Sequence, residues 1–403
     1  QQTFQPNNLN QQNYQNYQNQ SNYQNQNPNQ IPMAVPIRQS DYNLRGTMTG
    51  QLLNSSLYWI YPLVLLALEV IIIALIGIFY KFDRRNTTTE YESLKYISTE
   101  GIIDDISLKY GIFQDFNIMI FVGFGILHNV LRKHSWTTII INLICGILSF
   151  QISLCFLLLW KNTFLERWKK GVMNFDTMTS ALFNSATVLV SLGSVLGKLS
   201  FPQYIIMASI ESLISSLNYK LCEEKMGAID SGGVMYIHLF GSIFGIAICT
   251  VLFCSTKEKI KIAECSFNYK NSYFSNTICF FGTLFFWCYL PSFNSALIKN
   301  ENAKYRGIVN TYLALLGSTV GSFTMSALLN NGQFVFEQIL FGSYAGGVMI
   351  SGCCGICDLG YIASLIGFLG GIITTLSLKY LKPYLVEYKL QDTANVVHAH
   401  FIP

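Results

Sequence analysis

The sequence predicts an all-α, polytopic helical membrane protein. Of its 403 residues, 51% are hydrophobic and 12% are charged, a balance too apolar and too poor in charge for a soluble domain. The apolar residues also occur in blocks of about twenty, the length that a helix needs to cross the hydrocarbon core of a bilayer. The net charge of +4 is small, so the composition predicts a lipid bilayer as partner and no nucleic acid.

The apolar blocks predict about ten transmembrane spans. Glycine pairs four residues apart, such as Gly241/Gly245 and Gly317/Gly321, predict that some of these helices pack tightly against one another. We place the spans at about 57–80, 112–131, 137–160, 178–197, 202–222, 233–254, 274–297, 306–329, 336–356 and 359–380.

The N-terminal segment 1–50 differs from the rest of the chain. Twenty-one of its first thirty residues are Gln or Asn, which cannot bury a core, so we expect a disordered tail before the transmembrane domain 51–403. The long polar loop 81–111 of that domain contains Asn86-Thr87-Thr88, an N-glycosylation sequon. Asn86 is therefore a glycosylation candidate if this loop faces a secretory lumen.

Two ionisable residues stand out in Met226–Thr250, where Asp230 precedes an apolar run and His238 lies inside it. Such residues at membrane depth often mark the pathway of an ion or a proton. They lie eight residues apart, about 12 Å along a continuous helix, which is too far for a shared metal ion. The alternatives are a helix cap at Asp230 and a buried, hydrogen-bonded imidazole at His238.

A phenylalanine followed directly by an asparagine occurs in two of the predicted spans. Phe293 and Asn294 come directly after Pro291 and Ser292, which predicts a broken or kinked helix that lines a cavity. We expect Phe183-Asn184 to interrupt the fourth span in a similar way. The alternative for both phenylalanines is ordinary core packing.

The sequence gives the other ionisable residues no clear catalytic or metal-binding role. Glu211 is followed by three nearby serines that are able to satisfy it inside the membrane. His398 and His400 have no further ligand at metal-binding spacing, so we expect no metal site. The sequence has no phosphate-binding loop, nucleotide fingerprint or nucleophile–base motif, so we expect neither a cofactor nor enzyme activity.

Seven motifs occur in order along the chain. They are FQDFNIMIFVGFG (113–125), GSVLGKLS (193–200), DSGGVMYIHLFGSIFG (230–245), GTLFFWCYLPSFNSA (282–296), RGIVNTY (306–312), YAGGVMISG (344–352) and YLKPYLVEYKLQDT (380–393). Together they resemble the Rhesus-glycoprotein branch of the ammonium transporter family, over residues 110–403. The extra first span and its sequon are also typical of this branch.

The resemblance assigns a role to each candidate residue. The outer vestibule would contain Asp230, and the narrow lumen would be lined by His238 and His400. Phe183 and Phe293 would form a stacked gate, which Asn294 follows. The resemblance thus implies a homotrimeric channel that recruits ammonium and passes ammonia, in the plasma membrane or another cellular membrane. Carbon dioxide is a further candidate for the conducted molecule.

Two features depart from the family. Phe401 stands where the family has a glycine, beside the second histidine, and we expect its ring to reshape the lumen. The family has eleven to twelve spans, so we expect one or two more after Pro403. The alternative functions are a non-conducting Rhesus-like scaffold or ammonium sensor, and an ion-coupled permease for another small solute.

Overall fold

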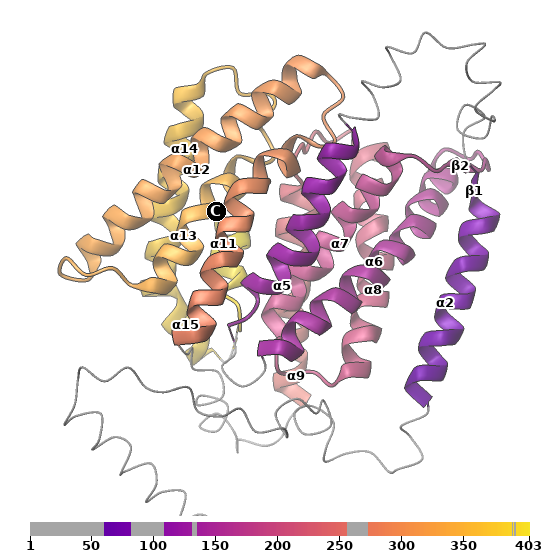
Figure 1. Cartoon of the computed structure of the whole chain (residues 1–403), viewed down its shortest axis with the longest axis horizontal. Helices are drawn as coiled ribbons and strands as arrows, with labels where there is room; N and C mark the ends of the chain where they lie inside the picture. The colour runs from indigo at the N-terminus through magenta and orange to yellow at the C-terminus, as the bar shows by residue number, and fades with distance from the viewer. Residues whose placement is uncertain (1–59, 82–108, 131–134, 256–272, 389, 391) are drawn as a thin grey trace, which may run out of the picture. The chain divides into compact units, whose positions relative to one another are not determined.

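The computed structural model describes residues 60–81, 109–130, 135–255, 273–388, 390 and 392–403 (Figure 1). The predicted tail and the sequon at Asn86 lie outside these residues. The long helices, in chain order, are α2 (Ile60–Phe79), the helix Lys109–Leu127 with its last turn α5 (Phe124–Leu127), α6 (Ser135–Phe164), α7 (Phe175–Val195), α8 (Phe201–Lys220), α9 (Phe240–Ser255), α11 (Tyr273–Ser295), α12 (Glu301–Leu329), α13 (Phe336–Ile350) and α14 (Gly360–Leu376).

Each of the ten predicted ranges overlaps one of these helices, and the boundaries differ by at most seven residues, at the start of α9. Among the described residues, seven helices are long and apolar enough to cross a membrane by length and composition. The shorter elements are α15 (Lys382–Glu387) and five π-helical segments: η5 (Ile118–Gly123), η6 (Leu221–Lys225), η7 (Val234–Leu239), η8 (Ser377–Leu381) and η9 (Val397–Phe401). The predicted all-α, polytopic class is therefore confirmed.

Local sequence explains where several helices begin. The side chain of Asn174 accepts a hydrogen bond from the Thr177 N–H at 2.9 Å at the start of α7. Asn300 does the same for Ala303 at 3.0 Å at the start of α12. An Asn side chain before the first turn satisfies a backbone N–H that has no partner inside the helix. These starts are therefore encoded by single residues.

Three features differ from the sequence predictions. Helix α7 runs unbroken through Phe183 and Asn184, so the predicted interruption of this span is wrong. Pro291 lies inside α11 and the helix continues to Ser295, so the alternative of a helix broken at this proline is wrong. Two short strands, β1 (Tyr80–Lys81) and β2 (Gly171–Val172), pair in parallel and were not predicted.

The unbroken course of α7 has a physical cause. The amide nitrogen of Asn184 donates to Ser153 Oγ at 2.7 Å and to the Ser212 carbonyl at 3.1 Å, on α6 and α8. Because the side chain bonds to neighbouring helices, it does not compete for the backbone of its own helix. Asn184 thus holds three helices together.

Glycines set the closest helix contacts, as predicted. A Cβ on Gly317 or Gly321 of α12 would overlap carbonyl oxygens of α14. On Gly241 or Gly245 of α9 it would lie 2.7–2.8 Å from carbonyl oxygens of α7. Small residues allow helices to approach this closely in a membrane, where lipid provides little driving force for association.

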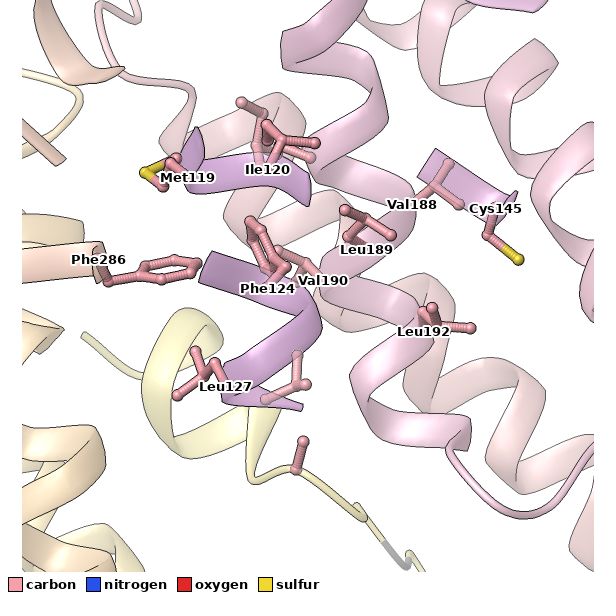
Figure 2. Packing of buried hydrophobic residues seen from close by; sticks show 14 of the residues in the cluster. Met119, Ile120, Phe124, Leu127, Cys145, Val188, Leu189, Val190, Leu192 and Phe286 are labelled. Atoms are coloured by element: carbon pink, nitrogen blue, oxygen red, sulfur yellow. The ribbon is translucent and has the colours of Figure 1, made fainter. Parts of the chain in front are cut away.

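The largest buried cluster surrounds α5, α7 and α11. Figure 2 shows Phe124 of α5 and Phe286 of α11 beside Leu189 and Val190 of α7. The outer helix α2 instead leaves most of its apolar side chains exposed, with 61% for Leu63. Apolar side chains on an outer helix suit contact with lipid, while the buried cluster surrounds the site residues.

Candidate functional site

Asp230 forms the cap that one alternative predicted. Its two carboxylate oxygens accept hydrogen bonds from the backbone N–H groups of Val234 (2.8 Å) and Met235 (2.7 Å). The hydroxyl of Tyr236 donates to the Asp230 carbonyl at 2.5 Å. Both oxygens are therefore engaged in holding the first turn of η7.

The segment from Asp230 to His238 is not one continuous helix. Gly233 has a φ of +79°, in the left-handed region that favours glycine, and η7 begins at the next residue. The distance of about 12 Å that a continuous helix would give therefore does not apply. Burial raises the pKa of the Asp230 carboxyl, and the N–H groups of Met235 and Val234 act in the opposite direction because they favour its ionised form.

His238 and His400 meet although 162 residues separate them. Their Nδ1 atoms are 3.0 Å apart, and the rings are stacked with centroids 5.0 Å apart and an interplanar angle of 12°. η7 carries the first imidazole and η9 the second. The structure thus brings together the two histidines that the resemblance paired.

The tautomers of this pair follow from the short contact. In a neutral pair, one Nδ1 must donate and the other accept, so the two rings have opposite tautomers. One Nε2 then carries a hydrogen and the other carries a lone pair. Nε2 of His238 is buried and has no hydrogen-bond partner among the described residues. The pair is therefore able to offer one donor and one acceptor to a small molecule.

Phe183 of α7 and Phe293 of α11 stack with centroids 4.7 Å apart, as the resemblance implied. Phe293 also lies 6.4 Å from the ring of His238. A third ring, Phe116 of the helix Lys109–Leu127, stacks on Phe183 at 4.9 Å and on Phe293 at 4.6 Å. Sequence reasoning missed Phe116, because no spacing along the chain links it to the other two rings.

Asn294, next to Phe293, forms hydrogen bonds to two neighbouring helices. Its amide nitrogen donates to Thr311 Oγ1 at 3.1 Å and to the Gly347 carbonyl at 2.9 Å, which connects α11 to α12 and α13. A Cβ on Gly232 would lie 2.6 Å from Asn294 Oδ1, so the loop after Asp230 passes directly over this amide. Asn294 therefore ties the Phe293 helix to α12 and α13 and packs against the Asp230 loop.

Three further polar residues are buried inside the protein. Glu211 is fully buried and accepts from Ser191 Oγ of α7 at 2.5 Å, not from the serines that follow it in sequence. His398 contacts Ser377 Oγ through Nδ1 at 3.0 Å. His128, which sequence reasoning did not single out, contacts Asn142 Oδ1 through Nδ1 at 2.9 Å.

Phe401, the departure at the second histidine, lines a cavity of about 170 Å³. Ile246, Cys249 and Val397 line the same cavity. The Phe401 side chain is 44% exposed, whereas the neighbouring His400 is 5% exposed. Within the described part of the chain, no group of three or more His, Cys, Asp or Glu side chains has the arrangement of a metal site.

Comparisons with known proteins identify the family of the chain. The sequence model of the Ammonium Transporter Family matches residues 103–403. The chain is 33% identical to the dog (Canis lupus familiaris) protein named ammonium transporter Rh type A, over 86% of this chain and 81% of that protein. It is 32% identical to Xenopus laevis ammonium transporter Rh type B-A, over 88% and 76%.

Solved structures share the fold. Rh50 of Nitrosomonas europaea, whose title describes conduction by the Rhesus protein family of channels, has a TM-score of 0.64 and 27% identity, over 73% of this chain and 76% of that chain. Mep2 of Saccharomyces cerevisiae matches in fold, with a TM-score of 0.57 and 17% identity over 74% and 70%. The chain is therefore a Rhesus-type member of the ammonium transporter family.

Proposed function

We propose that this protein conducts ammonia across a membrane, along a path from the Asp230 loop past the phenylalanine rings to the His238–His400 pair. The observation that carries the proposal is the 3.0 Å contact between two buried imidazoles directly beside the stacked rings. Ammonium is charged and loses a large hydration energy on leaving water, whereas neutral ammonia loses far less. A narrow apolar passage thus favours the neutral molecule.

Asp230 supports the entrance by position rather than by direct ligation. Both its oxygens accept backbone N–H groups, so few lone pairs are left for an ammonium ion. Its negative charge still raises the local concentration of cations, and its bonds orient the turn that carries His238. Asp230 acts as a positioning residue with an electrostatic contribution.

Phe183 and Phe293 form the barrier that separates water from the lumen. Their exposed fractions are 0% and 1%, so they exclude bulk water and hydrated ions. Ammonium that reaches this barrier transfers a proton to water on the entrance side and continues as ammonia. The His238–His400 pair then offers one hydrogen-bond donor and one acceptor, which suits a molecule that is able to do both.

The chain is a multi-pass integral membrane protein, with the lipid bilayer as its environment. We further propose a homotrimer with one passage in each subunit, and a transport role without enzymatic turnover. Support for an assembly comes from the resemblance to the family. Native mass spectrometry in detergent tests the trimer directly, and a monomer would contradict it.

Reconstituted vesicles test the conduction. Proteoliposomes that contain the chain should alkalinise faster than empty vesicles after an ammonium pulse in a stopped-flow pH assay. His238→Ala should lower the rate about tenfold or more, since it removes a hydrogen-bonding group from a desolvated passage. His398→Ala is the matched control, a buried histidine on η9 outside the stacked pair.

The same traces separate the alternatives. A scaffold or ammonium sensor gives no rate above that of empty vesicles. A pulse of dissolved carbon dioxide, read as acidification, decides whether this gas also passes. Equal rates for wild type and His238→Ala would refute the proposed path.

A further inference from the structure

The gate contains three aromatic rings. Phe116, Phe183 and Phe293 make all three pairwise stacks, at centroid distances of 4.6–4.9 Å and interplanar angles of 6–23°. None of the three side chains is more than 1% exposed. The rings come from three separate helices, Lys109–Leu127, α7 and α11, so each helix contributes one ring.

Passage requires at least one of these rings to move. A molecule in van der Waals contact with two ring faces needs them to stand about 7 Å apart, two contacts of about 3.5 Å each. The observed separations are all below 5 Å. Because each ring stacks on both others, moving any one of them breaks two stacking contacts.

The backbone around Phe116 differs from the backbone around the other two rings. Phe183 lies in unbroken α7, where every residue from Ala181 to Val195 is buried. Phe293 lies two residues after Pro291, which also removes one helical hydrogen bond, but its neighbour Asn294 is tied to two other helices. Phe116 instead lies two residues before η5, where the backbone changes to the wider π-helical turn. Such turns interrupt the regular hydrogen-bond ladder and occur often at functional sites.

One hydrogen bond holds the helix of Phe116 in position relative to the helix of Phe293. Ser292 Oγ donates to Asp115 Oδ2 at 2.7 Å. Asp115 directly precedes Phe116 and Ser292 directly precedes Phe293, so the bond joins the two helices next to their stacked rings. Asp115 and Ser292 are both partly buried, which makes this bond stronger than one in open water.

We propose that Phe116 is the third ring of the gate and its mobile element, and that the Asp115–Ser292 hydrogen bond is the positioning contact that holds this ring closed. The inference rests on the proposed conduction and adds the residue that sets its selectivity. Displacement of Phe116 opens the space that its own ring fills against Phe183 and Phe293, and the size of the ring limits which amines pass.

A graded series at Phe116 tests this. Phe116→Leu should raise the ratio of methylammonium to ammonia flux in proteoliposomes about tenfold, because two ring stacks no longer oppose opening. Phe116→Trp should lower both fluxes, since a larger ring is harder to displace. Phe124→Leu is the matched control, because Phe124 is 1% exposed, lies on the same helix and packs on Phe286 outside the gate. Its flux ratio should equal that of wild type.

Variants of Asp115 and Ser292 test the hydrogen bond between them through the same ratio of methylammonium to ammonia flux. Ser292→Ala should change the flux ratio in the same direction as Phe116→Leu, and should add nothing when combined with it. Asp115→Asn should restore the wild-type ratio that Asp115→Ala loses, because the amide oxygen still accepts from Ser292.

The outcomes distinguish the two proposals. A wild-type protein without ammonia flux overturns both. A conducting wild type whose flux ratio is unchanged in Phe116→Leu, or changed equally in Phe124→Leu, overturns the third-ring assignment alone. Phe116→Trp keeps an aromatic ring in the core, so an unchanged flux in that variant also counts against it.

Discussion

Replacement of Asp230 gives the sharpest test of how the entrance is built. Asp230→Ala leaves the N–H groups of Val234 and Met235 without their acceptors in a site where Asp230 itself is 7% exposed. A buried donor without a partner costs about 1–3 kcal/mol, so the two together cost about 2–6 kcal/mol of unfolding free energy. Because these bonds form the first turn of η7, His238 should also lose its orientation toward His400.

Asp230→Asn separates the cap from the charge. The amide oxygen still accepts one N–H, while the amide nitrogen faces the other as a second donor. We therefore expect the free energy of unfolding to decrease from the wild type to Asp230→Asn and to be lowest in Asp230→Ala. A residue that acted only through its charge would give equal losses of flux in both variants and no loss of stability.

The assay pairs thermal unfolding in detergent with stopped-flow flux on the same preparations. Asp176→Ala is the matched control, because Asp176 pairs with Lys109 at 3.1 Å on the surface, where its side chain is 64% exposed. An exposed ion pair contributes about 0–1 kcal/mol, so this variant should unfold near the wild-type temperature. If Asp230→Ala unfolds at the wild-type temperature, Asp230 does not hold the start of η7 and the reasoning fails.

Three further changes probe the framework around the site. Gly367→Ala should lower the unfolding temperature strongly, since its Cβ would overlap the backbone of Ala314, whereas Gly77→Ala meets nothing within 4 Å and should be neutral or slightly stabilising. Glu211→Gln should remain close to wild type in thermal unfolding because its amide oxygen still accepts from Ser191, and a large loss would show that the carboxylate charge is required. Asn294→Ala should lose about 1–3 kcal/mol with its two donated bonds, and an unchanged unfolding temperature would contradict the role of these bonds in tying α11 to α12 and α13.

Much of the fold was predictable because the signals are local. Span length, the caps at Asn174 and Asn300 and the glycines of α9 and α12 depend on neighbours within one or two helical turns or on composition. The cap at Asp230 was foreseen as an alternative for the same reason, since Asp before Gly-Gly is a short-range pattern. The break predicted at Phe183-Asn184 failed because Asn184 found its partners on other helices.

The candidate site also combines features that the sequence predicts with contacts that only the tertiary structure shows. The sequence by itself determined the membrane class and the helices, and its ordered motifs singled out the candidate residues Asp230, His238, His400, Phe183, Phe293 and Asn294. Tertiary structure decided that the imidazoles meet at 3.0 Å across 162 residues, and that Phe116 stacks on Phe183 and Phe293 next to the Asp115–Ser292 hydrogen bond, which joins residues 177 apart. Helical periodicity shows which residues share a face of one helix. Which faces of two helices contact each other depends on how the helices pack, and the sequence pattern does not give this.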